Sequence, residues 1–234
     1  MQDFSLAFSA AIALIAGGDP ELWHIIGLSL AVTLSATLIA TLIGAPLGAL
    51  LAIARFPGRR VVVVVLNGFM GLPPVVVGLA VYLLLSRSGP LGSLGLLFTA
   101  KAMVIAQSIL ITPIIASLMR QIVSDAWGDY REQLVSLGAG AWQSGLTLLW
   151  DTRFSLVTAW LAGFGRAAAE VGAVMIVGGN IAHYTRVMTT AIALETTKGD
   201  LPLALGLGFV LIAIIMGVNA LAYAIRAYAQ RRYR

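Results

Sequence analysis

The chain has 234 residues, of which 59% are hydrophobic and only 11% are charged, and its formal net charge is +5. This composition is far from that of a soluble domain and indicates a single membrane domain over residues 1–234. Because the chain has no cysteine, disulfides and thiolate metal or redox sites are excluded. Most basic residues flank apolar stretches, so the positive charge is better explained as a membrane-topology signal than as a nucleic-acid surface.

The N-terminal apolar stretch, Phe4 to Ala16, is too short to span a bilayer, which takes about 20 residues. We predict an interfacial helix within an extracytoplasmic segment, residues 1–21; the alternative is a sixth, poorly matched span. Asp19, Pro20 and Glu21 then predict a helix start, with an N-cap acid, a proline at the first helical position and an acid at the positive end of the helix dipole.

Five further apolar stretches predict transmembrane helices. They are Leu22 to Ala54, Val61 to Leu85, Ala100 to Met119, Phe154 to Val177 and Leu203 to Ile225. Small residues in the first, among them Gly44 and Gly48, favour close helix packing. Pro73 and Pro74 interrupt the second, and irregular backbone at membrane depth requires packed protein or a cavity beside it. The segment Gly178 to Leu201 is predicted to be a loop, which begins with a turn at Gly178-Gly179-Asn180.

The third and fourth spans carry polar side chains. Gln107, Ser108, Thr112 and Pro113 predict a polar-lined and kinked third span. Arg166 and Glu170 lie four residues apart in the fourth span, where they would share a helix face and could form an ion pair. Two interpretations stay open: a self-neutralising pair that fixes helix packing, or an arginine that gives positive potential along a path for an anion.

Enzymatic chemistry finds little support in the sequence. The two histidines, His24 and His183, lie in different segments without the spacing of a zinc site. No phosphate-binding P-loop and no Gly-x-Ser-x-Gly nucleophile turn occurs. We therefore expect a protein that is not an enzyme and that holds no metal.

The distribution of basic residues predicts the orientation. Ten lie in the segments on one side of the five spans and four on the other, while the N-terminal segment has only acids. The positive-inside rule then places the N-terminus outside and residues 124–153 and 226–234 in the cytoplasm.

The cytoplasmic segment contains a polar helix start between two spans. Asp129 and Glu132 have the spacing of a capping box, and Gly138 and Gly140 can end the helix and turn the chain. We predict a short docking helix from Tyr130 to Leu137 at the membrane surface.

This segment resembles the signature loop of ABC-importer permeases, Glu-Ala-Ala-x3-Gly-x9-Ile-x-Leu-Pro. Glu132 and Gly138 match, and Leu148 is conservative at the isoleucine position. The sequence departs from the signature at Gln133, Leu134, Trp150 and Asp151. Together with residues 71–78 and 165–173, this order resembles the molybdate, sulfate and tungstate branch over essentially the whole chain. Residues 178–181 and 184–192 look most like tungstate permeases.

The resemblance implies an all-α polytopic protein of the type I ABC-importer permease fold, with about five transmembrane helices in the inner membrane. It further implies a homodimer, two ATP-binding subunits that hold ATP and magnesium, and an extracytoplasmic binding protein that delivers tungstate. The ATPase-coupling residues would be Tyr130, Arg131, Glu132, Gln133, Leu137 and Gly138. The candidate path residues are Arg166, Glu170, Pro73, Pro74, Gln107, Ser108 and Thr112. The alternatives are a molybdate or sulfate permease, a proton-coupled carrier that uses Arg166 and Glu170, or an assembly subunit.

Overall fold

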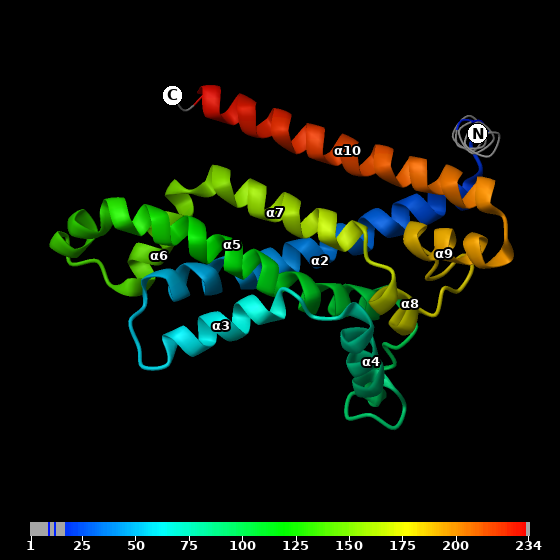
Figure 1. Ribbon diagram of the computed structural model, residues 1–234, viewed down its shortest axis with the longest axis horizontal. Coiled ribbons are helices and arrows are strands. Elements are labelled where there is room, and N and C mark those ends of the chain that lie inside the picture. The colour runs from blue at the N-terminus through cyan, green and yellow to red at the C-terminus, as the bar shows by residue number, and fades with distance from the viewer. Residues whose placement is uncertain (1–8, 10–11, 13–16, 233–234) are drawn as a thin grey trace. The chain divides into compact units, whose positions relative to one another are not determined.

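The computed structural model describes residues 9, 12 and 17–232, and its longer elements are helices (Figure 1). They are α2 (Pro20–Ile53), α3 (Arg59–Phe69), α4 (Pro74–Leu85), α5 (Ala100–Ser136), α6 (Ala141–Asp151), α7 (Arg153–Ala168), α8 (Gly172–Gly178), α9 (Met188–Lys198) and α10 (Leu201–Arg232), with a short 3₁₀ turn at Gly92–Leu94. The interfacial helix predicted for Phe4 to Ala16 lies outside the described residues except for Ser9 and Ile12.

The helices match the predicted membrane spans in number. Three of them, α2, α5 and α10, are long and apolar enough to cross a bilayer, and the count rises to five if the pairs α3–α4 and α7–α8 are each one interrupted span. This confirms an all-α protein with about five spans. The interruption at Pro73–Pro74 is also confirmed, because α3 ends at Phe69 and α4 begins at Pro74.

Helix α2 begins as its sequence predicts. Its first residue is Pro20, and the Asp19 carboxylate accepts a hydrogen bond of 2.9 Å from the N–H of Glu21. The capping acid satisfies one of the N–H groups that have no partner inside the helix.

The chain divides into two compact units, and each is built from three separate segments. Unit 1 comprises residues 1–35, 73–107 and 167–221, and unit 2 comprises residues 36–72, 108–166 and 222–234. In unit 1, α4 lies beside α8 (Figure 1), where a Cβ atom at Gly78 would be 2.7 Å from the Cα atom of Ala173. A second cluster in this unit joins the first turns of α2 to α9 and α10 through Leu22, Met188 and Leu207.

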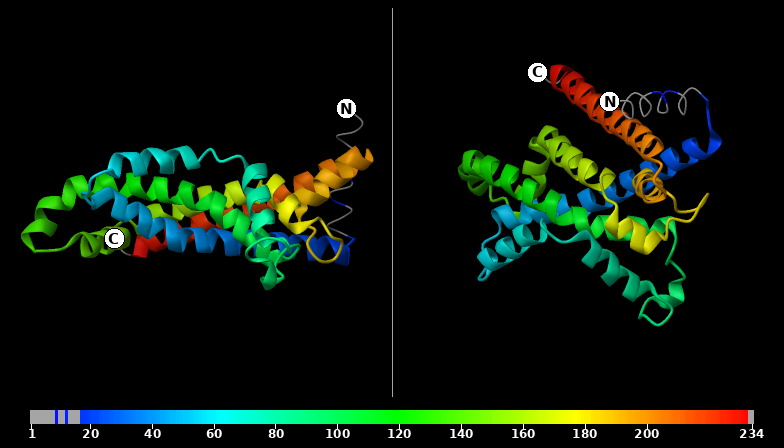
Figure 2. Two further views of the ribbon diagram at one scale, coloured as in Figure 1. Left: turned by 90° about the horizontal axis from the view of Figure 1, so that it is seen from below. Right: turned by 45° about the vertical axis from the view of Figure 1, so that its right-hand side comes forward.

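In unit 2, α3 and α5 pack against the C-terminal part of α2 (Figure 2), with Leu51, Leu66 and Ala116 in contact. The predicted close approach of small residues is confirmed here. A Cβ atom at Gly44 would lie 2.9 Å from the carbonyl oxygen of Thr112, and one at Gly48 would lie still closer to the carbonyl oxygen of Ala116 in the next turn of α5. Glycine at these positions lets two helix backbones meet without intervening side chains.

Three expectations about helix bounds are wrong. The fourth span is not continuous, because Ala169 to Val171 separate α7 from α8. The segment from Gly178 to Leu201 is not all loop, since α9 packs its Met188 and Ala191 into the core of unit 1. The docking helix is not a separate element, because α5 runs unbroken from Ala100 to Ser136. Helix α5 also continues through Pro113.

We predict that Gly48→Ala destabilises the protein by about 1–3 kcal/mol, because overpacking a close helix contact shifts the backbone. The new Cβ atom would meet the backbone nitrogen of Arg120 at 2.8 Å. Gly27→Ala in the same helix is the matched control, since no atom lies within 4 Å of its Cβ position. The measurement is the melting temperature in detergent, and equal values for the two variants would contradict this packing.

Candidate functional site

The break between α7 and α8 is stabilised by a buried acid. Glu170 is only 4% exposed, and its Oε1 atom accepts a hydrogen bond of 3.1 Å from the N–H of Ala173 in the first turn of α8. A carboxylate at this place satisfies a helix-terminal N–H and complements the positive end of the helix dipole. Glu170 therefore has a structural function that its sequence position did not reveal.

Side chains from two other helices satisfy carbonyls at the same break. The Gln107 side chain of α5 donates from Nε2 to the carbonyl oxygen of Ala167 at 3.2 Å. The Thr189 hydroxyl of α9 donates to the carbonyl oxygen of Glu170 at 2.8 Å. Without water, carbonyls freed from a helix need such partners at membrane depth. The Oε1 atom of the Gln107 amide is buried and has no hydrogen-bond partner among the described residues.

The second interrupted span lies next to this break. Pro74 is the first residue of α4, and the carbonyl oxygen of Pro73 accepts hydrogen bonds from the N–H groups of Val76 and Val77 at 3.0 and 3.2 Å. A Cβ atom at Gly172 would touch Val75 at 3.0 Å. The first turns of α4 and α8 are thus in contact within unit 1. The structure therefore brings four predicted path residues, Pro73, Pro74, Gln107 and Glu170, to one region.

The other three predicted path residues belong to unit 2. Ser108 donates to the carbonyl oxygen of Ala36 at 3.4 Å, and Thr112 donates to the carbonyl oxygen of Ser108 at 2.7 Å. Both hydroxyls thus use their proton on backbone carbonyls and keep acceptor capacity. Arg166 is half-buried in the last turn of α7, where a cation complements the negative end of the helix dipole.

The sequence predicted that Arg166 and Glu170 lie on one face of a continuous helix, and this expectation is wrong, because the helix is interrupted between them. Helix α7 ends at Ala168, so Glu170 lies beyond it in the break.

The predicted coupling residues lie at the end of α5. Tyr130, Arg131, Glu132, Gln133, Leu137 and Gly138 are all exposed, Leu137 at 81%. Gly138 has a φ of 72°, the N–H of Gly138 bonds to the carbonyl of Val135, and that of Ala139 bonds to Leu134. These contacts form a Schellman motif, which confirms Gly138 as the residue that ends the helix. The predicted capping box at Asp129 is wrong, because α5 runs through this position and no helix begins there. Nothing near Asp129 interrupts the helix, since the only helix-weakening residue beside it is Gly128, and one glycine inside a helix costs only about 1 kcal/mol.

A second helix, α6, follows this turn and was missed from the sequence. Its start is stabilised by the Gln143 side chain, which accepts a hydrogen bond of 3.1 Å from the N–H of Gly140. Leu148, at the isoleucine position of the signature, is buried and anchors α6, whereas Trp142 and Trp150 are exposed. The helical spacing of Trp142, Leu146 and Trp150 was the signal that could have revealed it. The predicted coupling segment is therefore a helix–turn–helix.

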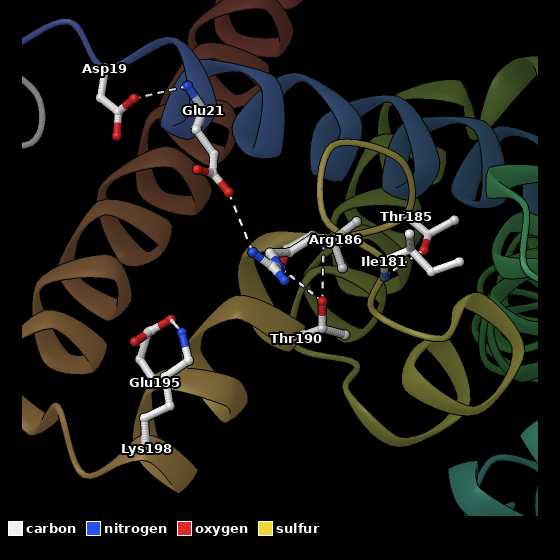
Figure 3. Close-up of polar contacts among 9 residues, drawn as sticks. Asp19, Glu21, Ile181, Thr185, Arg186, Thr190, Glu195 and Lys198 are labelled. Atoms are coloured by element: carbon white, nitrogen blue, oxygen red, sulfur yellow. Dashed lines mark hydrogen bonds and ion pairs between the residues drawn. The ribbon is translucent and has the colours of Figure 1, made fainter.

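The loop after α8 is tied to the start of α2 in unit 1 (Figure 3). Gly179, at a φ of 73°, ends α8, which confirms the predicted turn. Thr185 donates to the carbonyl oxygen of Gly178 at 2.6 Å, and the Arg186 guanidinium forms an ion pair of 3.3 Å with Glu21. These contacts fix the loop between α8 and α9; the sequence predicted the loop and its first turn but not these contacts.

Comparison with known proteins gives close relatives, although no family model matches the chain. It is 39% identical to the probable anion ABC transporter permease protein of Haloferax volcanii over 216 residues. This alignment covers 89% of this chain and 93% of that protein. It is also 39% identical to the tungstate uptake system permease protein TupB of Peptoclostridium acidaminophilum over 226 residues. That alignment covers 97% of this chain and 99% of that protein. Identity to the molybdenum transport system permease protein ModB of Escherichia coli is 28% over 195 residues, 78% of this chain and 83% of that protein.

These identities extend over the helices that carry both the interrupted spans and the exposed turn at Gly138. In such transporters ATP is bound by a separate ATPase subunit, and the permease is not itself catalytic. The chain belongs to the oxyanion class of ABC transporter permeases and is the multi-pass transmembrane subunit of an importer.

Proposed function

We propose that the oxyanion is tungstate, carried into the cytoplasm across the inner membrane by a homodimer of this chain. The observation that supports tungstate is the 39% identity to a tungstate permease over 97% of the chain, against 28% to a molybdenum permease over 78%. Molybdate and sulfate are the alternatives, because all three are tetrahedral dianions.

The proposed assembly has two ATP-binding subunits and an extracytoplasmic tungstate-binding protein around a permease domain of residues 1–234. The N-terminus would lie outside, and the basic C-terminal segment would lie in the cytoplasm, in agreement with the excess of basic residues in the cytoplasmic segments. A membrane-impermeant thiol reagent that labels Arg55→Cys in intact cells would contradict this orientation.

We expect wild-type complexes in proteoliposomes to accumulate tungstate in preference to molybdate and sulfate when the matching binding protein and ATP are supplied. The measurement is metal and sulfur uptake in parallel samples, and a complex without ATP is the control. Because selectivity would be left mainly to the binding protein, the permease alone would bind tungstate only weakly. Preferential uptake of molybdate or sulfate, or nanomolar binding of tungstate by the isolated permease, would contradict the proposal.

The proposed coupling surface is the helix–turn–helix of α5 and α6, with Tyr130, Arg131, Glu132, Gln133, Leu137 and Gly138 against the ATPase. Its exposed residues are both charged and apolar, and the turn between the helices is fixed by a left-handed glycine. Because α5 is one helix from Ala100 to Ser136, a push on its exposed end acts on the span itself and not on a flexible linker. Closure of the ATPase subunits would drive alternating access in this way.

We predict that Glu132→Ala lowers the stimulation of ATPase activity by substrate several-fold while the helix stays intact, because an exposed Glu in a helix contributes little to folding. Gly138→Val should weaken both coupling and assembly, since a β-branched residue is strained at a φ of 72°. The matched control is Gly128→Ala in the same helix, whose Cβ position is open. Wild-type uptake and ATPase stimulation in both test variants would remove this surface from the mechanism.

The proposed path for the anion runs beside the interrupted spans and offers few fixed charges. Arg166 gives positive potential, and Pro73, Pro74, Gln107, Ser108, Thr112 and Glu170 contribute backbone and side-chain polar groups. Weak and distributed interactions suit transport, because a strongly cationic site would hold a dianion and slow its release. A proton-coupled carrier is less favoured, since Glu170 already caps α8.

We predict different results for two substitutions of Glu170. Glu170→Gln keeps an oxygen that can accept the hydrogen bond from Ala173 and should retain assembly, whereas Glu170→Ala should lose about 0.5–2 kcal/mol of stability with the cap. Glu195→Gln is the matched control for removal of a carboxylate away from the break, because Glu195 is also largely buried, at 15% exposed, and pairs with Lys198 near the end of α9. Thermal stability and uptake are measured together. If Glu170→Gln abolished ATP-driven uptake in a stable complex, the carboxylate charge would have a direct part in transport.

A further inference from the structure

The loop that joins α2 to α3 carries cations without a protein counter-ion. No Asp or Glu occurs between Leu22 and Ser124, although Arg55, Arg59 and Arg60 lie in this stretch. Among the described residues, Arg55 and Arg60 form neither an ion pair nor a hydrogen bond, and both are exposed. Their charge is thus left for a partner outside the chain.

Arg59 differs from its two neighbours because it has a structural partner. Its guanidinium donates from Nε to the carbonyl oxygen of Leu51 at 2.7 Å and from Nη2 to that of Ala52 at 3.1 Å. It thereby caps the last turn of α2, whose final carbonyls have no partner inside the helix. This contact fixes the loop and leaves Arg55 and Arg60 as the available cations.

A hollow of about 510 Å³ opens at this loop, lined by Arg55, Phe56, Gly58, Arg59, Arg60 and Val61. Helix α3 begins here with Gly58 as N-cap, and it has neither a side-chain cap nor an acid in its first turn. The helix end adds a small positive potential of the same sign as the two arginines. The hollow therefore suits a negatively charged group.

An apolar stripe continues from the hollow along α3. Val61, Val65 and Phe69, which are spaced four residues apart, are exposed on one side of the helix together with Val64. Leu66, in contrast, is buried and packs against Leu51 and Ala116. From Val61 to Phe69 the stripe is about 12 Å long at ~1.5 Å per residue. A soluble anion would use the arginines but not this stripe.

We infer that the hollow and stripe form a binding site for an anionic phospholipid, with its phosphate at Arg55 and Arg60 and an acyl chain along Val61, Val64 and Val65. The charge pattern favours a lipid over a second protein surface, because an amphiphile has an anionic head joined to an apolar tail. Anionic lipids attract basic residues next to a membrane helix. The site is independent of the transported anion, since it needs no residue of the proposed path.

The test uses the complete permease–ATPase complex in nanodiscs with spin-labelled phosphatidylglycerol or phosphatidylcholine. We expect the wild type to prefer phosphatidylglycerol and the preference to fall about fivefold for each arginine removed in Arg55→Gln and Arg60→Gln, the equivalent of ~1 kcal/mol each. Arg87→Gln is the matched control, because Arg87 is also exposed in the acid-free stretch but has no second cation next to it in the sequence. Arg55→Lys combined with Arg60→Lys should retain the preference.

Several results would overturn the inference. One is an unchanged preference in the double glutamine variant, and another is an equal loss in Arg87→Gln, which would indicate a general effect of charge. Displacement of the labelled lipid by glycerol phosphate at millimolar concentration would indicate a site for a soluble anion. Oxidative cross-linking of Val64→Cys to a second copy would show that protein covers the stripe. Any cross-link would come from the introduced cysteine, because the wild type has none. If the double glutamine variant failed to assemble, the lysine variant would decide, since loss of its preference also contradicts the site.

Discussion

The need to satisfy backbone hydrogen bonds without water governs this structure. A continuous helix meets the need by itself, but two of the five apolar segments are interrupted, and each interruption leaves N–H and carbonyl groups without helical partners. Between Ala167 and Gly172, three side chains supply the missing hydrogen bonds. They are the carboxylate of Glu170 in the break, the amide of Gln107 in α5 and the hydroxyl of Thr189 in α9. These contacts explain why a hydrophobic chain keeps a buried acid and a buried amide at this depth.

This solution also links elements that are far apart in the sequence. Gln107 and Ala167 are joined by one hydrogen bond, and Thr189 joins α9 to the same break. Glycine at position 78 then lets α4 approach α8 at backbone distance, so the two interrupted spans pack together. Irregular backbone and close packing at one place are typical of regions where membrane transporters handle their substrates.

Composition and local chemistry were enough to predict the number of spans, the helix start at Pro20, the interruption at Pro73–Pro74 and the helix end at Gly138. Each depends on residues within one turn, such as a capping acid, a proline pair or a left-handed glycine. The break at Ala169 to Val171 could not be predicted, because no proline marks it and its stability comes from Gln107 and Thr189, distant in sequence. Helix α9 was missed for a related reason: its polar sequence resembles a loop, and its stability comes from packing of Met188 and Ala191 against other helices. Of the proposed site, the residue types were found from the sequence, but the function of Glu170 as a cap required the fold.

The length of α5 has a consequence for the membrane that does not depend on the orientation of the protein. Its 37 residues correspond to about 55 Å at ~1.5 Å per residue, whereas the hydrocarbon layer is only about 30 Å thick. Without tilt, about 25 Å of this helix lies among head groups or in water, and tilt shortens that length. The charges of Asp125, Asp129, Arg131 and Glu132 fall in that part. The thickness of the lipid layer thus sets how far the end of α5 stands from the bilayer. In a thicker membrane less of the helix would protrude, so the height at which an ATPase could engage it would vary with lipid composition.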